Sequence, residues 1–301
     1  MSWLSVTLIV NAASVEMLSD ALLEAGAIAV DVTDAQAGTA DENALFGEPG
    51  EPTAPQWAQS RVKALFEAHP DVAARVAAAL RATGLDAATA REITRVADQD
   101  WVRATHRQFQ PVRVSPRLWV VPTWHTPPDP EAINLVIDPG LAFGTGTHPT
   151  TRLCLAWLDA NLRGGERVLD YGCGSGILGI AAMKLGAAHA TGVDIDEQAL
   201  LAARHNAMQN QVMMDFAAAG AAPEAADIVL ANILANPLRL LAPLLARATR
   251  RGGRILLSGV LVRQAAEVQD AYREWFDLHP VQNDDGWVLI SGSKRTERST
   301  E

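Results

Sequence analysis

The sequence contains few cysteines and no cluster of metal-binding residues. Among its 301 residues, Cys154 and Cys173 are the two cysteines, and no Cys/His cluster accompanies them. The sequence therefore argues against a disulfide framework and against a zinc site. Such sparing use of cysteine is typical of the reducing cytoplasm. We expect a cytoplasmic protein that holds no metal.

Basic residues and long apolar runs are also scarce. The chain has 25 Lys and Arg against 35 Asp and Glu, a net charge of −10, whereas a general nucleic-acid binder needs a basic face. We therefore expect no direct contact with nucleic acid. The first residues, MSWLSVTLIVNAA, lack a basic region and predict a strand rather than a signal peptide. No run approaches the roughly 20 apolar residues of a membrane helix.

The first part of the chain, residues 1–97, predicts a small α+β domain. Its runs follow one another as β-α-β-β-α-β, the ferredoxin-like pattern. Residues 41–55 are acidic and rich in Pro and Gly, which predicts a loop. Residues 98–132, with several Trp and Pro, predict a linker that runs into a short hairpin. The predicted strands are 3–10, 27–32, 61–66 and 91–96, and the predicted helices are 15–24 and 70–83.

Residues 133–301 show a different pattern. Strand-like runs alternate with helical ones, which predicts βαβ units and an α/β domain with a doubly wound, mostly parallel sheet. The runs FDLHPVQN and GWVLISGSK predict an antiparallel pair at the edge of that sheet. The Ala-rich stretch 216–226 predicts a surface connection. The predicted strand runs are LVID, RVLDYG, ATGVDI, DIVLAN and RILLSG, with helical runs such as EQALLAARHNAMQ and PLRLLAPLLARAT.

A glycine-rich loop, VLDYGCGSG, follows an apolar strand and precedes a helix. We expect Gly172 and Gly174 to let the backbone approach a cofactor closely, with the helix N-terminus facing it. Gly174, Gly176 and Gly179 also satisfy the GxGxxG fingerprint. Asp194 ends the next strand, where an acid binds a ribose diol. These features alone fit a nicotinamide cofactor and an adenosyl cofactor equally.

Two further side chains favour an adenosyl cofactor. Asp170 precedes Gly172 by two residues, and a carboxylate there can receive the ammonium group of S-adenosylmethionine. Asn232 stands at the carboxyl end of a later strand, where open α/β sheets bind their ligands. This constellation resembles the class I methyltransferase pattern. Each part also has a structural alternative, since Asp194 could cap the following helix and Asn232 could serve a turn.

A second glycine-rich segment, GLAFGTGTHPTT, lies closely upstream. No Lys follows its glycines, so it is not a phosphate-binding P-loop. Pro149 suits the first position of a helix, and a Gly/Thr segment before it can close over a ligand and donate hydroxyl groups. The alternative is a helix cap with an irregular connection. His148 in this segment could accept a proton or could simply satisfy a cap.

The motifs DPGLAFGTGTHPTT, VLDYGCGSGILGIAAMKLGA, GVDID and ANILANPL, in this order, resemble the PrmA family, which methylates ribosomal protein L11 of the large subunit. The resemblance implies S-adenosylmethionine-dependent trimethylation of lysine ε-amines and of the N-terminal α-amine. It also implies that residues 1–97 recognise the ribosomal protein. Thr151, Gly172, Asp194 and Asn232 match the family's cofactor-binding positions. Asn232 is also the expected catalytic residue, because its amide oxygen can accept N–H bonds from the incoming amine.

The chain departs from the expected patterns at several positions. Thr105 stands where the family usually has a second Trp, and Asp215 is a weak candidate for the acid that binds adenine. Amine-modifying methyltransferases carry prolines and an aromatic residue after this Asn, and the run Asn232-Ile233-Leu234-Ala235 lacks them. This difference favours a wider opening to the substrate site. Two other functions stay open. They are a nicotinamide-dependent oxidoreductase and a module that retains the cofactor on the ribosome without catalysis.

Overall fold

The computed structural model describes residues 3–36, 57–86, 91–96, 109–139, 143–220 and 224–296. The chain divides into two compact units, Met1–Ala104 and Thr105–Glu301. The predicted loop at 41–55 and residues 98–108 of the predicted linker, Thr105 included, lie outside the described residues. In the described part of the chain, no helix is both long and apolar enough to cross a membrane.

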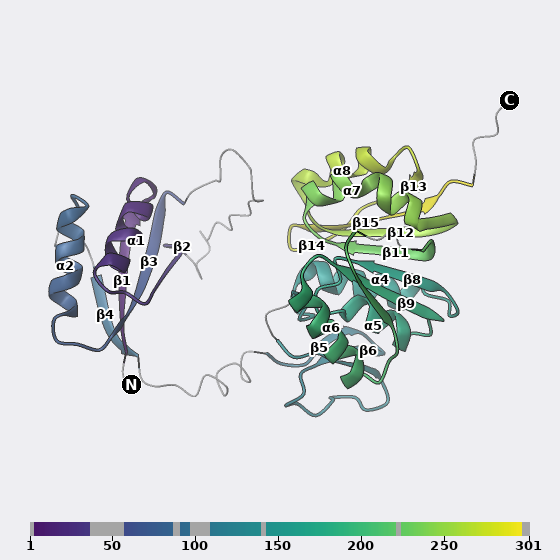
Figure 1. The fold of residues 1–301 in the computed structure, drawn as a ribbon, viewed down its shortest axis with the longest axis horizontal. Helices are drawn as coiled ribbons and strands as arrows, with labels where there is room; N and C mark the ends of the chain where they lie inside the picture. The colour runs from purple at the N-terminus through teal and green to yellow at the C-terminus, as the bar shows by residue number, and fades with distance from the viewer. Residues whose placement is uncertain are drawn as a thin grey trace. The chain divides into compact units, whose positions relative to one another are not determined.

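The first unit has the predicted ferredoxin-like arrangement (Figure 1). Its four strands pair antiparallel in the order β2-β3-β1-β4. Alternate residues of β1 and β3, among them Val6, Leu8 and Phe66, are buried against Leu18 and Leu80 of the two helices, because every second strand side chain faces the same side. The elements are β1 (Trp3–Asn11), α1 (Val15–Glu24), β2 (Ala29–Asp34), β3 (Gln59–Glu67), α2 (Val72–Ala82) and β4 (Arg91–Val96).

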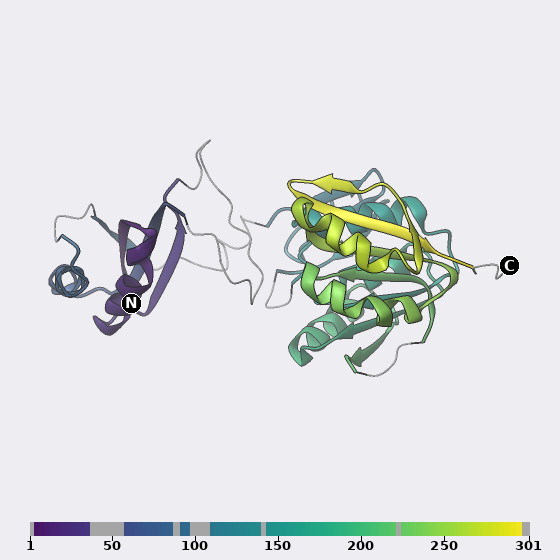
Figure 2. The same ribbon diagram turned by 90° about the horizontal axis from the view of Figure 1, so that it is seen from above.

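The second unit is built on an eight-stranded sheet with helices on both faces (Figures 1 and 2). The strand order is β10-β9-β8-β11-β12-β15-β13, with β14 paired to β15. Strands β8 to β12 pair parallel and β15 runs antiparallel. The strands are β8 (Arg167–Tyr171), β9 (His189–Asp194), β10 (Asp215–Ala218), β11 (Ala226–Asn232), β12 (Thr249–Leu261), β13 (Phe276–Leu278), β14 (Gln282–Asp284) and β15 (Trp287–Lys294).

Two hydrophobic clusters hold the helices to the sheet. One face packs α4, α5 and α6, and the other packs α7 and α8. Neighbouring residues of β11 divide between the clusters, with Leu230 in the first and Val229 in the second, as the period of two in a strand requires. The helices are α4 (Pro149–Asn161), α5 (Ile177–Lys184), α6 (Glu197–Gln209), α7 (Ala235–Ala248) and α8 (Ala265–Tyr272).

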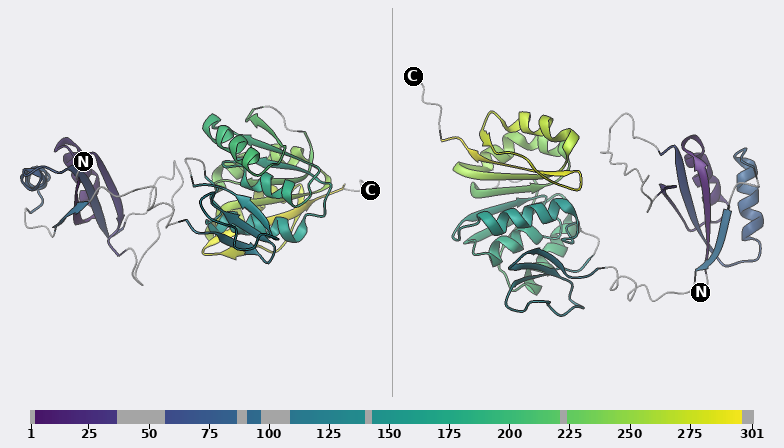
Figure 3. Two further views of the ribbon diagram at one scale, coloured as in Figure 1. Left: turned by 90° about the horizontal axis from the view of Figure 1, so that it is seen from below. Right: turned by 180° about the vertical axis from the view of Figure 1, so that it is seen from behind.

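Two predictions about strands were wrong in part. The run LVID contributes Leu135 and Val136 to a separate three-stranded sheet, on the side of α4 and α5 (Figure 3), where it pairs with a neighbouring strand. The side-chain amide of Asn210 bonds both backbone groups of Val136 there. The Ala-rich stretch begins with a strand, Asp215–Ala218, rather than a surface connection. The predicted antiparallel pair at the edge of the large sheet was confirmed, because β13 is the edge strand and pairs antiparallel with β15, which lies between β12 and β13. The small sheet consists of β5 (Val112–Ser115), β6 (Leu118–Val121) and β7 (Ile133–Val136).

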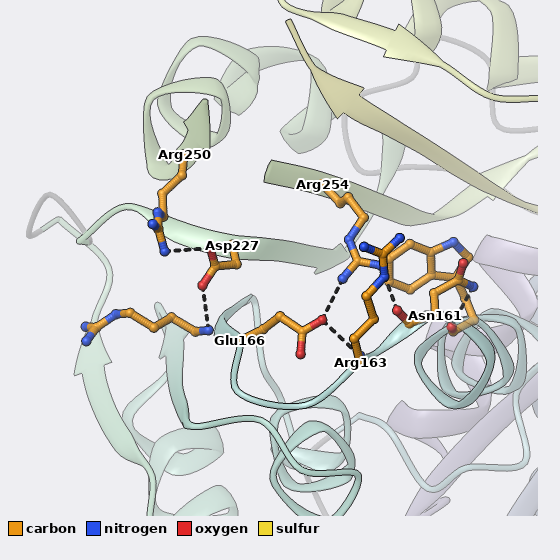
Figure 4. Close-up of polar contacts among 8 residues, drawn as sticks. Asn161, Arg163, Glu166, Asp227, Arg250 and Arg254 are labelled. Carbon is orange, nitrogen blue, oxygen red and sulfur yellow. Dashed lines mark hydrogen bonds and ion pairs between the residues drawn. The ribbon is translucent and has the colours of Figure 1, made fainter. Parts of the chain in front are cut away.

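Ion pairs hold the amino-terminal edge of the large sheet (Figure 4). Arg254 of β12 bonds Glu166 at 2.9 Å, just before β8, and stacks over the ring of Trp157 in α4. Asp227 of β11 accepts the backbone N–H at the start of β8 and pairs with Arg250. These contacts link β8, β11 and β12 at the amino-terminal edge of the sheet and so help to fix the positions of the same strands at the opposite edge.

Candidate active site

A cavity of about 630 Å³ lies at the carboxyl ends of β8, β9 and β11. The carboxyl ends of parallel strands meet at one edge of a sheet, and ligands of open α/β sheets bind there. The structure brings all the predicted cofactor-binding residues together, because each of them lines this cavity together with Asp170. They are Thr151, Gly172, Gly174, Asp194 and Asn232.

The glycine loop after β8 has a backbone that needs glycine. Gly172 and Gly174 have φ values of +74° and +52°, in the left-handed region. A Cβ on Gly172 would clash with the side chain of Ile233, and one on Gly174 would lie 2.6 Å from the carbonyl oxygen of Phe143. Gly176 then forms the N-cap of α5. Any larger residue at the first two positions would fill the space between the loop and its neighbours.

The upstream glycine segment packs against this loop and completes one wall of the cavity. The backbone N–H of Ser175 bonds the carbonyl oxygen of Phe143 at 2.9 Å, and the Ser175 hydroxyl bonds that of Gly144 at 2.7 Å. A Cβ on Gly144 would lie 2.7 Å from the same hydroxyl oxygen. The two glycine-rich segments therefore serve a single site.

Asp170 is buried in the wall of the cavity, with 1% of its surface exposed. Its Oδ2 accepts the backbone N–H of Gly179 at 2.9 Å. Burial raises the pKa of Asp170 to about 7; the Gly179 N–H opposes this shift and the nearby Asp194 carboxylate adds to it. A cationic ligand at this wall would stabilise the ionised carboxyl group.

Asp194 holds the glycine loop rather than capping a helix. Its two oxygens accept the backbone N–H groups of Gly174, at 2.8 Å, and Asp196, at 3.0 Å. The cap of α6 is Asp196, whose side chain accepts the N–H of Gln198. The alternative that Asp194 caps this helix was therefore wrong. Each carboxylate oxygen keeps a second acceptor site for a ligand. Asp215 does not line the cavity and pairs with a histidine elsewhere.

Two side-chain oxygens in the cavity wall are buried without a partner among the described residues. They are Oγ1 of Thr151, which is fully buried, and Oδ1 of Asn232. A buried polar group without a hydrogen bond costs about 1–3 kcal/mol, so such groups usually have a ligand or a water to bind. The site therefore offers one hydroxyl donor and one amide acceptor to a polar ligand.

Comparison with known proteins identifies the family. The family profile described as ribosomal protein L11 methyltransferase (PrmA) matches residues 2–295. The chain belongs to the ribosomal protein L11 methyltransferase family. Proteins with that name from Chromobacterium violaceum and Thiobacillus denitrificans are each 55% identical over 98% of this chain, and the match covers 99% and 100% of them, respectively. A crystal structure of ribosomal protein L11 methylase from Lactobacillus delbrueckii subsp. bulgaricus has a TM-score of 0.57 and 31% identity, over 62% of this chain and all of that one.

Membership of the ribosomal protein L11 methyltransferase family confirms the predicted fold class, enzyme class and cofactor. The chain is an S-adenosylmethionine-dependent methyltransferase with a class I, Rossmann-like domain. The alternative of a nicotinamide-dependent oxidoreductase was therefore wrong. The observed site fits the cofactor. Its buried carboxylate suits an ammonium group, its hydroxyl, which has no partner among the described residues, suits a carboxylate, and its glycines allow the backbone to approach closely.

His148 acts as a helix cap. It precedes Pro149, and its Nδ1 accepts the backbone N–H of Thr150 and lies 2.7 Å from the Thr150 hydroxyl. The neutral ring therefore carries its proton on Nε2 and has no free lone pair for a substrate proton. Burial lowers the pKa of His148, the Arg152 guanidinium adds to this shift, and Asp285 opposes it. The ring is thus a neutral part of the cavity wall.

Sequence reasoning missed several residues of the family's cavity. Phe143, Ile233 and Trp287 line it, as does Gly259 at the end of the parallel part of β12. Trp287 begins β15 and is far from every motif, so no local pattern could indicate it. Gly259 has φ of +84°, and a Cβ there would clash with the backbone of Ile233. The SG pair that ends the run RILLSG was the available signal for this residue.

Proposed function

We propose that this protein uses S-adenosylmethionine to trimethylate lysine ε-amines and the N-terminal α-amine of ribosomal protein L11, in the cytoplasm. The observation that carries the proposal is the pair of buried, unpartnered oxygens of Thr151 and Asn232 in one cavity, as seen among the described residues. When bound, S-adenosylmethionine supplies a methyl group on a positively charged sulfur that an amine nitrogen can displace.

Five residues would hold the cofactor. The Thr151 hydroxyl would donate to its carboxylate, and Asp170 would receive its ammonium group. Asp194 would accept hydrogen bonds from the ribose hydroxyls while it still holds the glycine loop. Gly172 and Gly174 would leave the backbone open to the methionine part. The burial of Asp170 and its raised pKa support this role. Burial destabilises the ionised carboxylate, and a cation bound beside it would stabilise that form.

Asn232 would position the amine for transfer. Its Oδ1 lines the cavity and can accept an amine N–H, and alignment of nucleophile and methyl group supplies much of the catalysis in such displacements. The nucleophile must be a neutral amine, although lysine has a reference pKa of about 10.4 and an α-amine about 7.7–8.0. Desolvation in this cavity disfavours the ammonium form, so the proton would leave to water.

No side chain in the cavity wall stands out as a dedicated base. His148 has its lone pair engaged, and burial raises the pKa of the Cys173 thiol, which keeps it protonated. Of the described lining residues, Asp170 and Asp194 are acidic, and no Lys or Arg is among them. This arrangement favours the cationic cofactor.

The first unit would recognise the ribosomal protein. Its described residues form a hydrophobic core of their own, and the described residues that line the cavity come from the second unit. We assign residues 1–97 to substrate recognition, 98–132 to the linker and hairpin, and 133–301 to the methyltransferase domain. A recognition domain that binds the substrate and is joined by a linker to the methyltransferase domain could present several amines to one cavity.

A methylation assay tests the proposal. The purified protein, S-adenosylmethionine and recombinant ribosomal protein L11 are expected to yield trimethylated amines by peptide mass spectrometry. Asn232→Ala should lower the rate about a hundredfold, because the amine loses its alignment. Asn236→Ala, an exposed asparagine outside the cavity, is the matched control. Tight binding of the cofactor without any methyl transfer would instead support the module that retains the cofactor without catalysis.

A further inference from the structure

Three neighbouring aromatic rings form one part of the lining of the active-site cavity, and the proposed function has not given them a role. The His148 ring lies between the other two, 5.4 Å from the centroid of Phe143 and 5.0 Å from that of Trp287. Both ring pairs meet edge to face, at 64° and 68°. Phe143 is 57% exposed although it lines the cavity, so this aromatic wall, Phe143–His148–Trp287, extends to the mouth.

The charges around the aromatic wall favour a cation. Asp170 and Asp194 lie in the same cavity, and no Lys or Arg is among its described lining residues. The lowered pKa of His148 keeps the central ring neutral, so it does not repel a positive group. Aromatic faces attract alkylated ammonium groups, so they can stabilise the positive charge that forms on a dimethylated nitrogen as it takes up the third methyl group.

Successive methyl transfers remove the groups that Asn232 can hold. In each transfer the amine lone pair forms an N–CH3 bond as the S–CH3 bond breaks, and the sulfur keeps that electron pair as a neutral thioether. The nitrogen is left as an ammonium ion, whose proton goes to water before the next transfer. A neutral primary amine offers two N–H bonds, a methylated amine offers one, and a dimethylated amine offers none. Asn232 therefore cannot orient the nitrogen for the third transfer.

We propose that the aromatic wall holds the dimethylated amine in place for the last methyl transfer and so determines that the product is trimethylated. The inference rests on the proposed function. Asn232 then governs the first transfer, and Phe143 and Trp287 govern the third. The first transfer needs an acceptor for amine N–H groups and the third needs an apolar, aromatic surface, and different parts of one cavity supply them.

Trp287→Leu and Phe143→Leu test the aromatic wall, since each keeps an apolar side chain but removes the aromatic face. Phe143 is half exposed, so its replacement leaves the core intact. Trp275→Leu is the matched control, because Trp275 packs against the α7 and α8 side of the sheet and does not line the cavity. The substrates are unmodified ribosomal protein L11 and the same protein after reductive dimethylation of its amines.

Two measurements separate the steps. In both cavity variants, the rate of the third transfer, on dimethylated substrate, should fall roughly threefold to tenfold more than the rate of the first transfer, with both rates measured at saturating S-adenosylmethionine. Fluorescence anisotropy with bound S-adenosylhomocysteine gives a readout without catalysis. The wild-type protein should bind dimethylated substrate more tightly than unmodified substrate, and the cavity variants should lose that difference while Trp275→Leu keeps it.

The outcomes distinguish the two proposals. Accumulated mono- and dimethylated products, with the third transfer slowed more than the first, support the aromatic wall. A wild-type protein that trimethylates, together with cavity variants that trimethylate equally well and keep the affinity difference, overturns the aromatic wall and leaves the proposed function standing. A wild-type protein that transfers no methyl group to ribosomal protein L11 overturns both.

Discussion

Replacement of Asp170 by asparagine should change how the stability of the protein depends on pH. Burial raises the pKa of Asp170 to about 7 in the folded protein, whereas an unfolded chain has about 3.9. Because the folded pKa is raised, the contribution of this group to stability is complete below about pH 4 and is lost as the pH rises through 7. From pH 5.5 to pH 7.5 the loss amounts to about 2 kcal/mol.

Asp170→Asn removes this titration but keeps an oxygen for the Gly179 N–H. Urea unfolding of both proteins at about pH 5.5 and 7.5 therefore measures the effect directly. The stability of the variant relative to the wild type should rise by about 2 kcal/mol over this interval. Any constant effect of the substitution cancels in that difference, as does the titration of groups that do not interact with Asp170.

The same carboxylate should make cofactor binding depend on pH. If Asp170 receives the ammonium group of S-adenosylmethionine, only its ionised form binds well, and affinity of the wild type should fall roughly twentyfold from pH 7.5 to pH 5.5. Asp170→Asn should bind weakly at both values with little change between them, as judged by calorimetric titration. Identical pH dependence of stability and affinity in the two proteins would refute the reasoning.

Three other changes test separate parts of the site. Thr151→Val removes a buried hydroxyl that lacks a described partner, so the melting temperature of the free protein should rise by a few degrees while cofactor affinity falls about tenfold; thermal scans and calorimetry check both signs. Gly259→Ala would clash with the backbone of Ile233 and should cost several kcal/mol in denaturant unfolding. Gly286→Ala, with a similar φ of +77° and nothing within 4 Å, should cost about 1 kcal/mol, from strain alone. Deletion of residues 1–104 should leave calorimetric cofactor binding nearly intact but abolish methylation of ribosomal protein L11; full-rate methylation by the truncated protein would place recognition in the second unit.

The site residues that the sequence predicts are those whose roles depend on short, fixed spacings along the chain. Gly172, Gly174 and Asp194 could be found because a tight turn at a strand end and an acid after the next strand leave short, fixed spacings in the sequence. Thr151 and Asn232 needed the family resemblance in addition, since a lone Thr or Asn at a helix start or a strand end has many uses. The structure then places all five on one cavity.

The aromatic wall could not be predicted, because the sheet order is what brings Trp287 to Phe143 and His148. Trp287 reaches the cavity since β15 inserts antiparallel beside β12, a pairing that no local spacing encodes. Phe143 reaches it through backbone bonds to the glycine loop. Strand β10 was missed for a different reason. Its sequence, DFAA, lacks the β-branched residues that mark a strand, and it is held by pairing with β9.

The two edges of the large sheet carry opposite kinds of polar group. At the amino-terminal edge, Glu166 pairs with Arg254 and Asp227 with Arg250, so these charges are neutralised (Figure 4). At the carboxyl edge, Asp170 is buried with a raised pKa, and among the described residues the Thr151 hydroxyl has no partner. Each of these groups destabilises the free fold and can be satisfied by a ligand that brings the complementary charge or acceptor. Binding of the cofactor should therefore stabilise this edge in particular.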